Sequence, residues 1–222
     1  MLNKKSLIWF LGITFGVSWI LFSLPLAFKS DPAKLAQMII IFFAVAMWGP
    51  GLAAIITTLF VEKQAFKTLR LNTLGPKRFY LLAWLIPPLL VLLTLATSIL
   101  LGTGQLDTSF NMLKEALAKT PAGQPIPAVG QALALQITFA LTLAPLINTL
   151  FALGEELGWR GFLLPHLLPL GQWRAILISG MIWGFWHAPT TLLFGYNFPM
   201  HPYLGILVTM VGCTLLGTVL SW

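Results

Sequence analysis

Six apolar runs, each about as long as a membrane-spanning helix, constrain this chain more than any other feature of its sequence. A helix needs about 20 consecutive, mainly apolar residues to cross a bilayer. Charged residues are only 9% of the chain, against about 25% in a soluble domain, and the mean hydropathy is +0.88. The sequence therefore predicts an all-α fold, a polytopic transmembrane helix bundle of about six membrane helices. The runs cover residues 6–28, 37–60, 79–101, 131–153, 175–194 and 204–222.

Glycine and proline mark the expected breaks within these runs. Gly49, Pro50 and Gly51 interrupt the second run, and the pair Pro87 and Pro88 predicts a kink in the third. Between the third and fourth runs, a short amphipathic helix is expected near Asp107–Lys119. Neither a repeat nor a domain boundary is visible, so we expect one integral membrane domain over residues 1–222, with its motif-bearing part at about 131–222.

The formal charge of +7 is best explained by topology, because cytoplasmic loops of membrane proteins are enriched in Lys and Arg. With the N-terminus inside, nine of the 13 basic residues fall on the cytoplasmic side and four outside. We therefore expect a cytoplasmic N-terminus and no nucleic-acid partner. The nine are Lys4, Lys5, Lys63, Lys67, Arg70, Lys77, Arg78, Arg160 and Arg174.

Only two of the six acidic residues lie inside apolar sequence. Four of them, Asp31, Glu62, Asp107 and Glu115, are expected to be solvated loop charges. Glu155 and Glu156 have apolar residues on both sides, and a charge at the bilayer centre costs about 2.5–3.5 kcal/mol. An intramembrane pair of this kind indicates a functional site.

Helical geometry separates the roles of the two neighbouring acids. They point about 100° apart on a helix, and Glu156 stands four residues before Arg160, the spacing of an ion pair on one face. Glu155 is then left without a cation of its own and is suited to proton transfer. The alternative is that Glu155, Glu156 and Arg160 together form a structural ion-pair lock.

His187 is the second candidate catalytic residue, because it lies inside the fifth apolar run. Gly180 and Gly184 share its helix face and form a G-x-x-x-G contact motif. This face is expected to pack against a neighbouring helix, most naturally the fourth run. Glu155 beside His187 would make a pair able to deprotonate a water; otherwise His187 is simply hydrogen-bonded in a helix interface.

Three further polar residues receive weaker assignments. Asn148 stands seven residues before Glu155 on the same face, where it would either orient that carboxylate or only pack. His166 and His201 lie in interfacial or loop segments and are not expected to be catalytic. Cys213 is the single cysteine, so an intrachain disulfide and a cysteine-based metal cluster are excluded.

Two short motifs carry a resemblance to a known family. The segment E-E-L-G-W-R over residues 155–160 matches a motif E-E-x-x-x-R, and W-G-F-W-H over 183–187 matches F-x-x-x-H with Trp183 in place of the Phe. In both respects the chain resembles the CPBP intramembrane proteases, also called the CAAX protease/Abi family. That family includes the type II CAAX prenyl endopeptidase and bacteriocin self-immunity proteins.

The resemblance implies an intramembrane endopeptidase that hydrolyses a peptide bond near the cytoplasmic membrane face. Glu155 would activate the attacking water, His187 would hold it, and Glu156 and Arg160 would support the motif together with Trp183. The implied partners are membrane lipids and a protein or peptide substrate, and the implied location is a prokaryotic plasma (inner) membrane. A divalent metal such as zinc is possible through the same resemblance, but Glu155 and His187 are two ligands, whereas catalytic zinc takes three.

The third motif of that family, H-x-x-x-N, has no counterpart in this sequence. His201 is the only histidine after His187, and the residue four positions later is Gly205. We therefore expect a partial family member of low activity, because the loss of one oxyanion donor costs about 10²–10³ in rate. The main alternative is a non-enzymatic immunity factor or partner-binding scaffold; a transporter is a weaker one, because the sequence lacks repeated halves.

Overall fold

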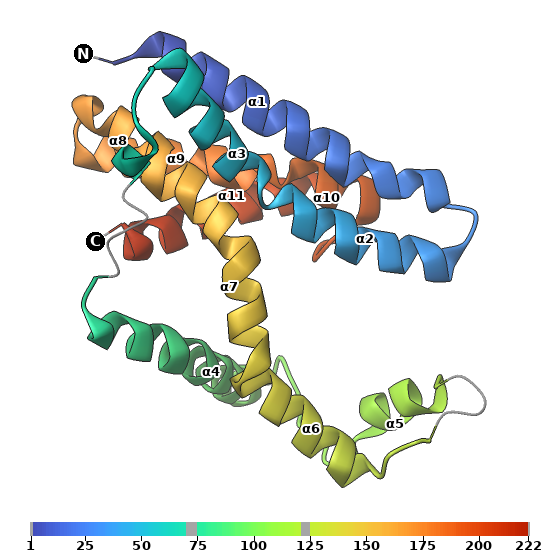
Figure 1. The fold of residues 1–222 in the computed structure, drawn as a ribbon. Helices are drawn as coiled ribbons and strands as arrows, with labels where there is room; N and C mark the ends of the chain where they lie inside the picture. Colours follow the sequence, from blue (N-terminus) through green and yellow to red (C-terminus); the bar gives the residue numbers. More distant parts are fainter. Residues whose placement is uncertain (1, 70–74, 121–124, 222) are drawn as a thin grey trace. The chain divides into compact units, whose positions relative to one another are not determined.

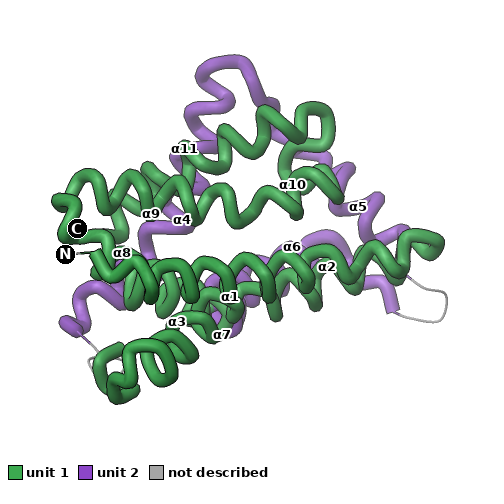
Figure 2. The backbone as a smooth tube through the Cα atoms, turned by 90° about the horizontal axis from the view of Figure 1, so that it is seen from above, with its two compact units in different colours: residues 1–72, 149–222 green, residues 73–148 purple. Residues whose placement is uncertain are grey.

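The computed structural model describes residues 2–69, 75–120 and 125–221, and every regular element within these ranges is a helix (Figure 1). Arg70, counted above among the cytoplasmic cations, and Trp222, the end of the sixth run, lie outside them. The chain divides into two compact units, residues 1–72 with 149–222 and residues 73–148 (Figure 2). The single-domain organisation of the chain stays a prediction.

Unit 1 begins with α1 (Lys4–Ser23), which continues through η1 (Leu24–Phe28). Asn3 caps the start of α1 by accepting a hydrogen bond from the Ser6 backbone N–H at 3.2 Å. One stripe of α1 with a period of four residues is buried, while its other faces remain exposed and apolar. The stripe consists of Ser6, Phe10, Thr14, Ser18 and Phe22.

The second apolar run forms α2 (Pro32–Ala46), α3 (Gly49–Ile56) and the π-helical η2 (Thr57–Val61). Asp31 caps α2 through the Lys34 backbone N–H at 3.1 Å. The helix breaks just before Gly49, where the sequence predicted an interruption. A short 3-10 turn, η3 (Phe66–Leu69), follows.

The second half of unit 1 starts inside α7 (Leu143–Glu156), which runs on into a π-helical segment, η4 (Leu157–Leu163). The packing is strongest between α9 and α11, and η4 packs against α3. The remaining elements are α8 (Leu164–Leu167), η5 (Leu168–Leu170), α9 (Gln172–Trp186), α10 (Ala188–Phe194) and α11 (Pro202–Leu220).

Glycines allow the start of α3 to cross the Glu155 segment at backbone distance. A Cβ at Gly51 would lie 2.8 Å from the Gly154 carbonyl oxygen, and a Cβ at Gly158 would lie 2.7 Å from the Pro50 carbonyl carbon. No side chain fits at such separations, so this crossing requires glycine. It fixes the backbone on both sides of Glu155.

The glycine face of α9 packs against α11, which corrects the expected partner. A Cβ at Gly180 would come within 2.5 Å of the Thr214 Cα, and one at Gly184 would collide with the Met210 backbone. The G-x-x-x-G motif therefore does bring two helices close together, but the neighbour is the sixth apolar run and not the fourth. Trp183, between these glycines in sequence, is the residue that reaches the end of α7.

Unit 2 contains α4 (Lys77–Leu100), α5 (Asn111–Ala118), α6 (Val129–Leu141) and the beginning of α7. Pro87 and Pro88 lie inside α4, and α5 confirms the short helix expected near Asp107–Lys119. Within the described part of this unit, α4, α5 and α6 bury no residue completely. Their apolar side chains are exposed, as expected for surfaces that face lipid.

The helices fit a protein embedded in a membrane. Five helical stretches among the described residues are long and apolar enough to span a bilayer, and a sixth is formed if Val129–Leu141 and Leu143–Leu170, bent by 42°, count as one span. The predicted all-α polytopic bundle of about six membrane helices is confirmed, and the chain is an integral membrane protein. The side of the membrane that holds the N-terminus stays a prediction.

Candidate active site

Glu155 lies in the last turn of α7, immediately before the π-helical segment, and its residue surface is only 7% exposed. Its Oε2 atom accepts two hydrogen bonds from indole groups, one from Trp183 Nε1 at 2.6 Å and one from Trp159 Nε1 at 3.3 Å. An indole nitrogen can only donate. Both partners therefore stabilise the carboxylate, and neither can take a proton from it.

Trp159, one of the two indole donors, is held by other aromatic rings. Trp159 is fully buried and packs edge-on against Phe10 and Trp186, with ring centroids 6.0 and 5.9 Å away. Such contacts are favourable geometries for aromatic pairs. The Trp159 donor to Glu155 is consequently preorganised. Trp159 was not identified from the sequence, although it stands four residues after Glu155, one turn further along the same helix face.

Glu156 forms the predicted ion pair with Arg160, with 3.0 Å between Oε1 and Nη1. The Glu156 side chain is 43% exposed, whereas that of Arg160 is 14% exposed. The guanidinium of Arg160 also lies over the Trp183 ring, 4.1 Å from its centroid, which is a cation–π contact. Arg160 therefore neutralises one acid of the motif and at the same time packs on the indole that holds the other.

His187 occupies the junction between α9 and α10. Its Nδ1 lies 3.0 Å from the Trp183 carbonyl oxygen. Because a carbonyl only accepts, Nδ1 carries a proton and donates it in this bond. In the neutral ring Nε2 is then the acceptor, and this nitrogen could accept a hydrogen bond from a water. The ring is fixed from one side by Trp186, edge-on at 4.7 Å.

Trp183 is the residue on which the predicted site residues converge. Its side-chain N–H donates to Glu155, its ring stacks on Arg160, and its backbone carbonyl accepts from His187. A phenylalanine in this position could provide the ring and the carbonyl but not the N–H donor. That Glu155 and His187 share one water stays a prediction, as do the catalytic roles of both. Asn148 belongs to unit 2, and its role in orienting Glu155 also stays a prediction.

The zinc ion left open by the resemblance is not supported by the ligands that the described residues offer. Among the described residues, no three His, Cys, Asp or Glu side chains are grouped closely enough to hold a metal ion. The ligand candidate Glu155 already accepts two N–H groups on one oxygen. This donor set does not fit catalytic zinc, which takes three protein ligands. The reaction proposed for this site therefore uses only the side chains and a water.

One buried acid was misjudged from the sequence. Glu62, expected to be a solvated loop charge, has a side chain only 12% exposed, and its Oε1 lies 2.7 Å from Nε2 of His166. The other ring nitrogen of His166 is 2.7 Å from the Phe162 carbonyl oxygen. Glu62 and His166 stand 104 positions apart in the sequence, so neither helix periodicity nor local spacing could have paired them.

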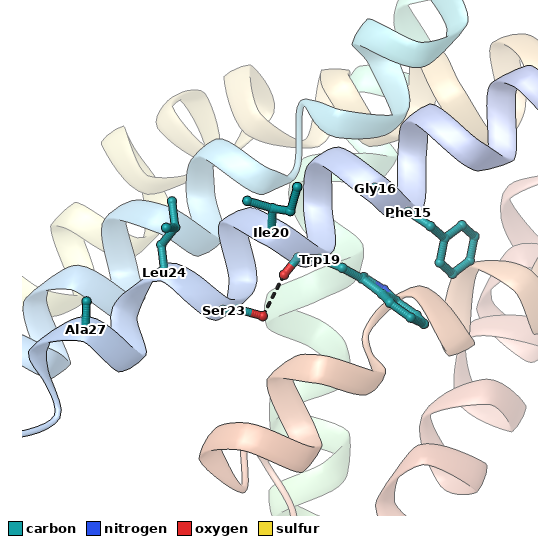
Figure 3. Close-up of a pocket in the computed structure, with 7 residues that line it drawn as sticks. All are labelled: Phe15, Gly16, Trp19, Ile20, Ser23, Leu24 and Ala27. Carbon is teal, nitrogen blue, oxygen red and sulfur yellow. Dashed lines mark hydrogen bonds between the residues drawn. The ribbon is translucent and has the colours of Figure 1, made fainter.

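An apolar surface depression runs along one side of α1 and η1, lined by residues between Phe15 and Ala27 (Figure 3). It contains none of the predicted catalytic residues. Trp19, one of its lining residues, nevertheless donates from Nε1 to the Trp186 carbonyl oxygen at 3.1 Å. In this way α1 supports the backbone immediately before His187.

Comparison with protein families agrees with the resemblance seen in the motifs. Residues 130–222 match the family model described as type II CAAX prenyl endopeptidase Rce1-like. The match includes both motifs and every predicted catalytic or supporting residue. A search of curated proteins and a search of solved structures each found no match. Over these residues the family match supports the resemblance to the CPBP/CAAX proteases that the two motifs carry.

Proposed function

We propose that this chain, whose residues 130–222 belong to the type II CAAX prenyl endopeptidase Rce1-like family, is a membrane-embedded endopeptidase that uses Glu155 as its general base. The observation that carries the proposal is the convergence of Glu155, Arg160 and His187 on Trp183. A single indole at this point connects both motifs of the family. The similarity to CAAX-type intramembrane proteases rests on the family match alone.

The proposed reaction begins with a water between Glu155 and His187. Glu155 takes one proton from this water while Nε2 of His187 accepts a hydrogen bond from the other hydrogen. The hydroxide oxygen attacks the carbonyl carbon of the scissile peptide bond and forms a tetrahedral intermediate. The carbon–nitrogen bond then breaks, and Glu155 returns its proton to the leaving nitrogen, so that a carboxylate and an amine are released.

The way in which Glu155 is held suits this task. Both indole hydrogen bonds fall on Oε2, and within the described residues Oε1 accepts none. Oε1 is therefore the oxygen that would meet the water. Because the two indoles cannot accept a proton, the group that gives Glu155 its proton must come from outside this cluster. A water or a substrate is the natural source.

As substrate we propose a prenylated CAAX peptide, in keeping with the description of the matching family. The test uses the purified full-length protein in lipid vesicles with two peptides, one carrying a C-terminal prenylated CAAX sequence and one unmodified. Wild-type protein is expected to cleave the prenylated peptide faster. Glu155→Gln should lower the rate by about 10³-fold, within the range for loss of a general base, while the protein remains folded by circular dichroism.

The matched control is Glu115→Gln, which removes an exposed acid of α5 and should leave the rate unchanged. If Glu155→Gln cleaves as fast as wild type, Glu155 is not the base and the proposal is wrong. If Glu155→Gln fails to fold while Glu115→Gln is normal, the alternative of a structural lock in a non-enzymatic scaffold is favoured instead.

A further inference from the structure

The residues around His187 place it at a break between two helices. α9 ends at Trp186 and α10 begins at Ala188, so His187 belongs to neither helix. Pro189 has no backbone N–H and cannot continue the hydrogen-bond ladder of α9. His187 accordingly has φ −77° and ψ −4°, whereas a regular α-helix has about −63° and −42°. The position of its ring therefore depends on tertiary contacts as well as on helix geometry.

The break redirects the backbone hydrogen bonds around Trp186. In an unbroken α-helix its carbonyl would accept from the N–H of Thr190, four residues later. Instead the Thr190 N–H donates to the His187 carbonyl oxygen at 3.0 Å, and the Thr190 hydroxyl donates to the same oxygen at 2.7 Å. Trp186 is only 1% exposed, and an unpaired carbonyl at such a depth is costly. A donor from another segment is therefore required.

Trp19 of α1 supplies this donor. Its Nε1 lies 3.1 Å from the Trp186 carbonyl oxygen, across 167 positions of sequence. Its ring also packs edge-on against Phe185, the residue before Trp186, with centroids 5.6 Å apart. About one turn further along α1, Phe22 meets the ring of Trp186 edge-on at 4.9 Å. α1 thus holds Trp186 both by its backbone and by its side chain.

We propose that Trp19, assisted by Phe22, is a positioning residue for His187. Trp186 transmits the constraint through its peptide bond to His187 and through its ring, which lies edge-on to the imidazole at 4.7 Å. The inference rests on the proposed function, because the position of His187 affects the rate only if His187 holds the water. It also extends the active site to α1, which lies outside residues 130–222 that match the family model.

The variant Trp19→Phe tests the role of the indole N–H, because it removes the donor and keeps an aromatic ring. With the purified protein in lipid vesicles and the prenylated CAAX peptide, we expect kcat to fall by about 3- to 10-fold, the equivalent of one neutral hydrogen bond, with KM unchanged. The matched control Trp9→Phe makes the same change at an exposed position of α1 and should leave kcat unchanged.

A double-mutant cycle shows whether Trp19 acts through His187. In the His187→Ala background, Trp19→Phe should lower the remaining rate no further, because the group that it positions is already gone. An equal fold-loss in both backgrounds, or a change in KM alone, would overturn the positioning role.

A measurement on the histidines separates failure of this inference from failure of the proposed function. The chain has three histidines, and ¹⁵N spectra of histidine-labelled protein report on each ring without a substrate. Trp19→Phe should shift the signals of His187 and leave those of His166 and His201 in place, whereas Trp9→Phe should move none. If the His187 signals shift but wild type cleaves no peptide, the proposed function is wrong and the positioning contact stands. If they do not shift, the positioning role is wrong even in an active protease.

Phe22→Leu provides an independent variant if Trp19→Phe does not fold. It keeps an apolar side chain and removes the ring contact with Trp186. The same His187 signals should shift, by less than in Trp19→Phe, because the hydrogen bond to the Trp186 carbonyl is retained. Unchanged His187 signals in Phe22→Leu would contradict the proposed hold of α1 on this histidine.

Discussion

Glu155 and Glu62 are both buried carboxylates of the same unit, but their partners differ in one chemical respect. Glu155 accepts from two indole N–H groups, which can donate and never accept. Glu62 meets an imidazole nitrogen, which can do both. The first carboxylate can therefore exchange a proton only with a molecule that arrives from outside. The second is in contact with a side chain of the protein that can donate or accept.

The kind of hydrogen-bond partner, indole or imidazole, distinguishes these two acids better than their burial does. Both side chains are largely withdrawn from the surface, so burial alone would assign them the same role. The chemistry of the first contact supports the proton transfer proposed for Glu155 and gives Glu62 a protein partner of its own. The same reasoning applies to the histidines, since His187 keeps Nε2 as an acceptor for a water and His166 uses Nε2 on Glu62.

The largest expected effect distinguishes these two histidines. His187→Ala removes the group proposed to hold the water, and we expect cleavage of the prenylated peptide to fall by about 10²–10⁴-fold with little change in Tm. His166→Ala should lower cleavage by less than about tenfold but should reduce Tm. The comparison fails if the two substitutions have equal effects on the rate.

The next effect concerns the two indole donors. Trp183→Phe keeps the ring over Arg160 but removes the 2.6 Å hydrogen bond to Glu155, and hydrogen bonds to charged groups contribute about 1.5–3 kcal/mol. We expect kcat to fall by about 10- to 100-fold with KM unchanged. Trp159→Phe removes the longer 3.3 Å bond and should have the smaller effect on kcat. A larger loss for Trp159→Phe, or a change in KM alone, would contradict this ranking.

The smallest expected effect is on stability and lies at the crossing beside Glu155. Gly158→Ala would place a methyl group against the Pro50 backbone, and overpacking of this kind costs about 1–3 kcal/mol. Gly12→Ala is the control, because a Cβ there meets nothing within 4 Å and alanine favours a helix over glycine by about 0.5–1 kcal/mol. Thermal unfolding should show the two substitutions moving Tm in opposite directions. Equal shifts would mean that the crossing is not tight.

Local features of the sequence predicted most of the fold and part of the site. The apolar runs gave the helices, the Gly-Pro-Gly segment gave the break before α3, and the i, i+4 spacing gave the ion pair between Glu156 and Arg160. Each of these depends on residues within a few turns of one another. The motif at 155–160 and His187 also indicated the family whose model matches residues 130–222.

Contacts between distant segments were not predictable in the same way. The G-x-x-x-G motif of α9 indicates that some helix approaches closely, but nothing in its spacing selects α11. The hydrogen bond from Trp183 to Glu155 and the pair of Glu62 with His166 join residues 28 and 104 positions apart. Periodicity along one helix carries no information about such partners. The acid at position 62 was consequently taken for an ordinary loop charge.

The central claim is that, of the two buried acids, Glu155 performs the chemistry and Glu62 does not. The most direct test is kcat/KM for the prenylated peptide, measured side by side for Glu155→Gln and Glu62→Gln in the same vesicles. We predict a loss of about 10³-fold for Glu155→Gln and of less than about tenfold for Glu62→Gln. Comparable losses in the two variants, or full activity in Glu155→Gln, would contradict the claim.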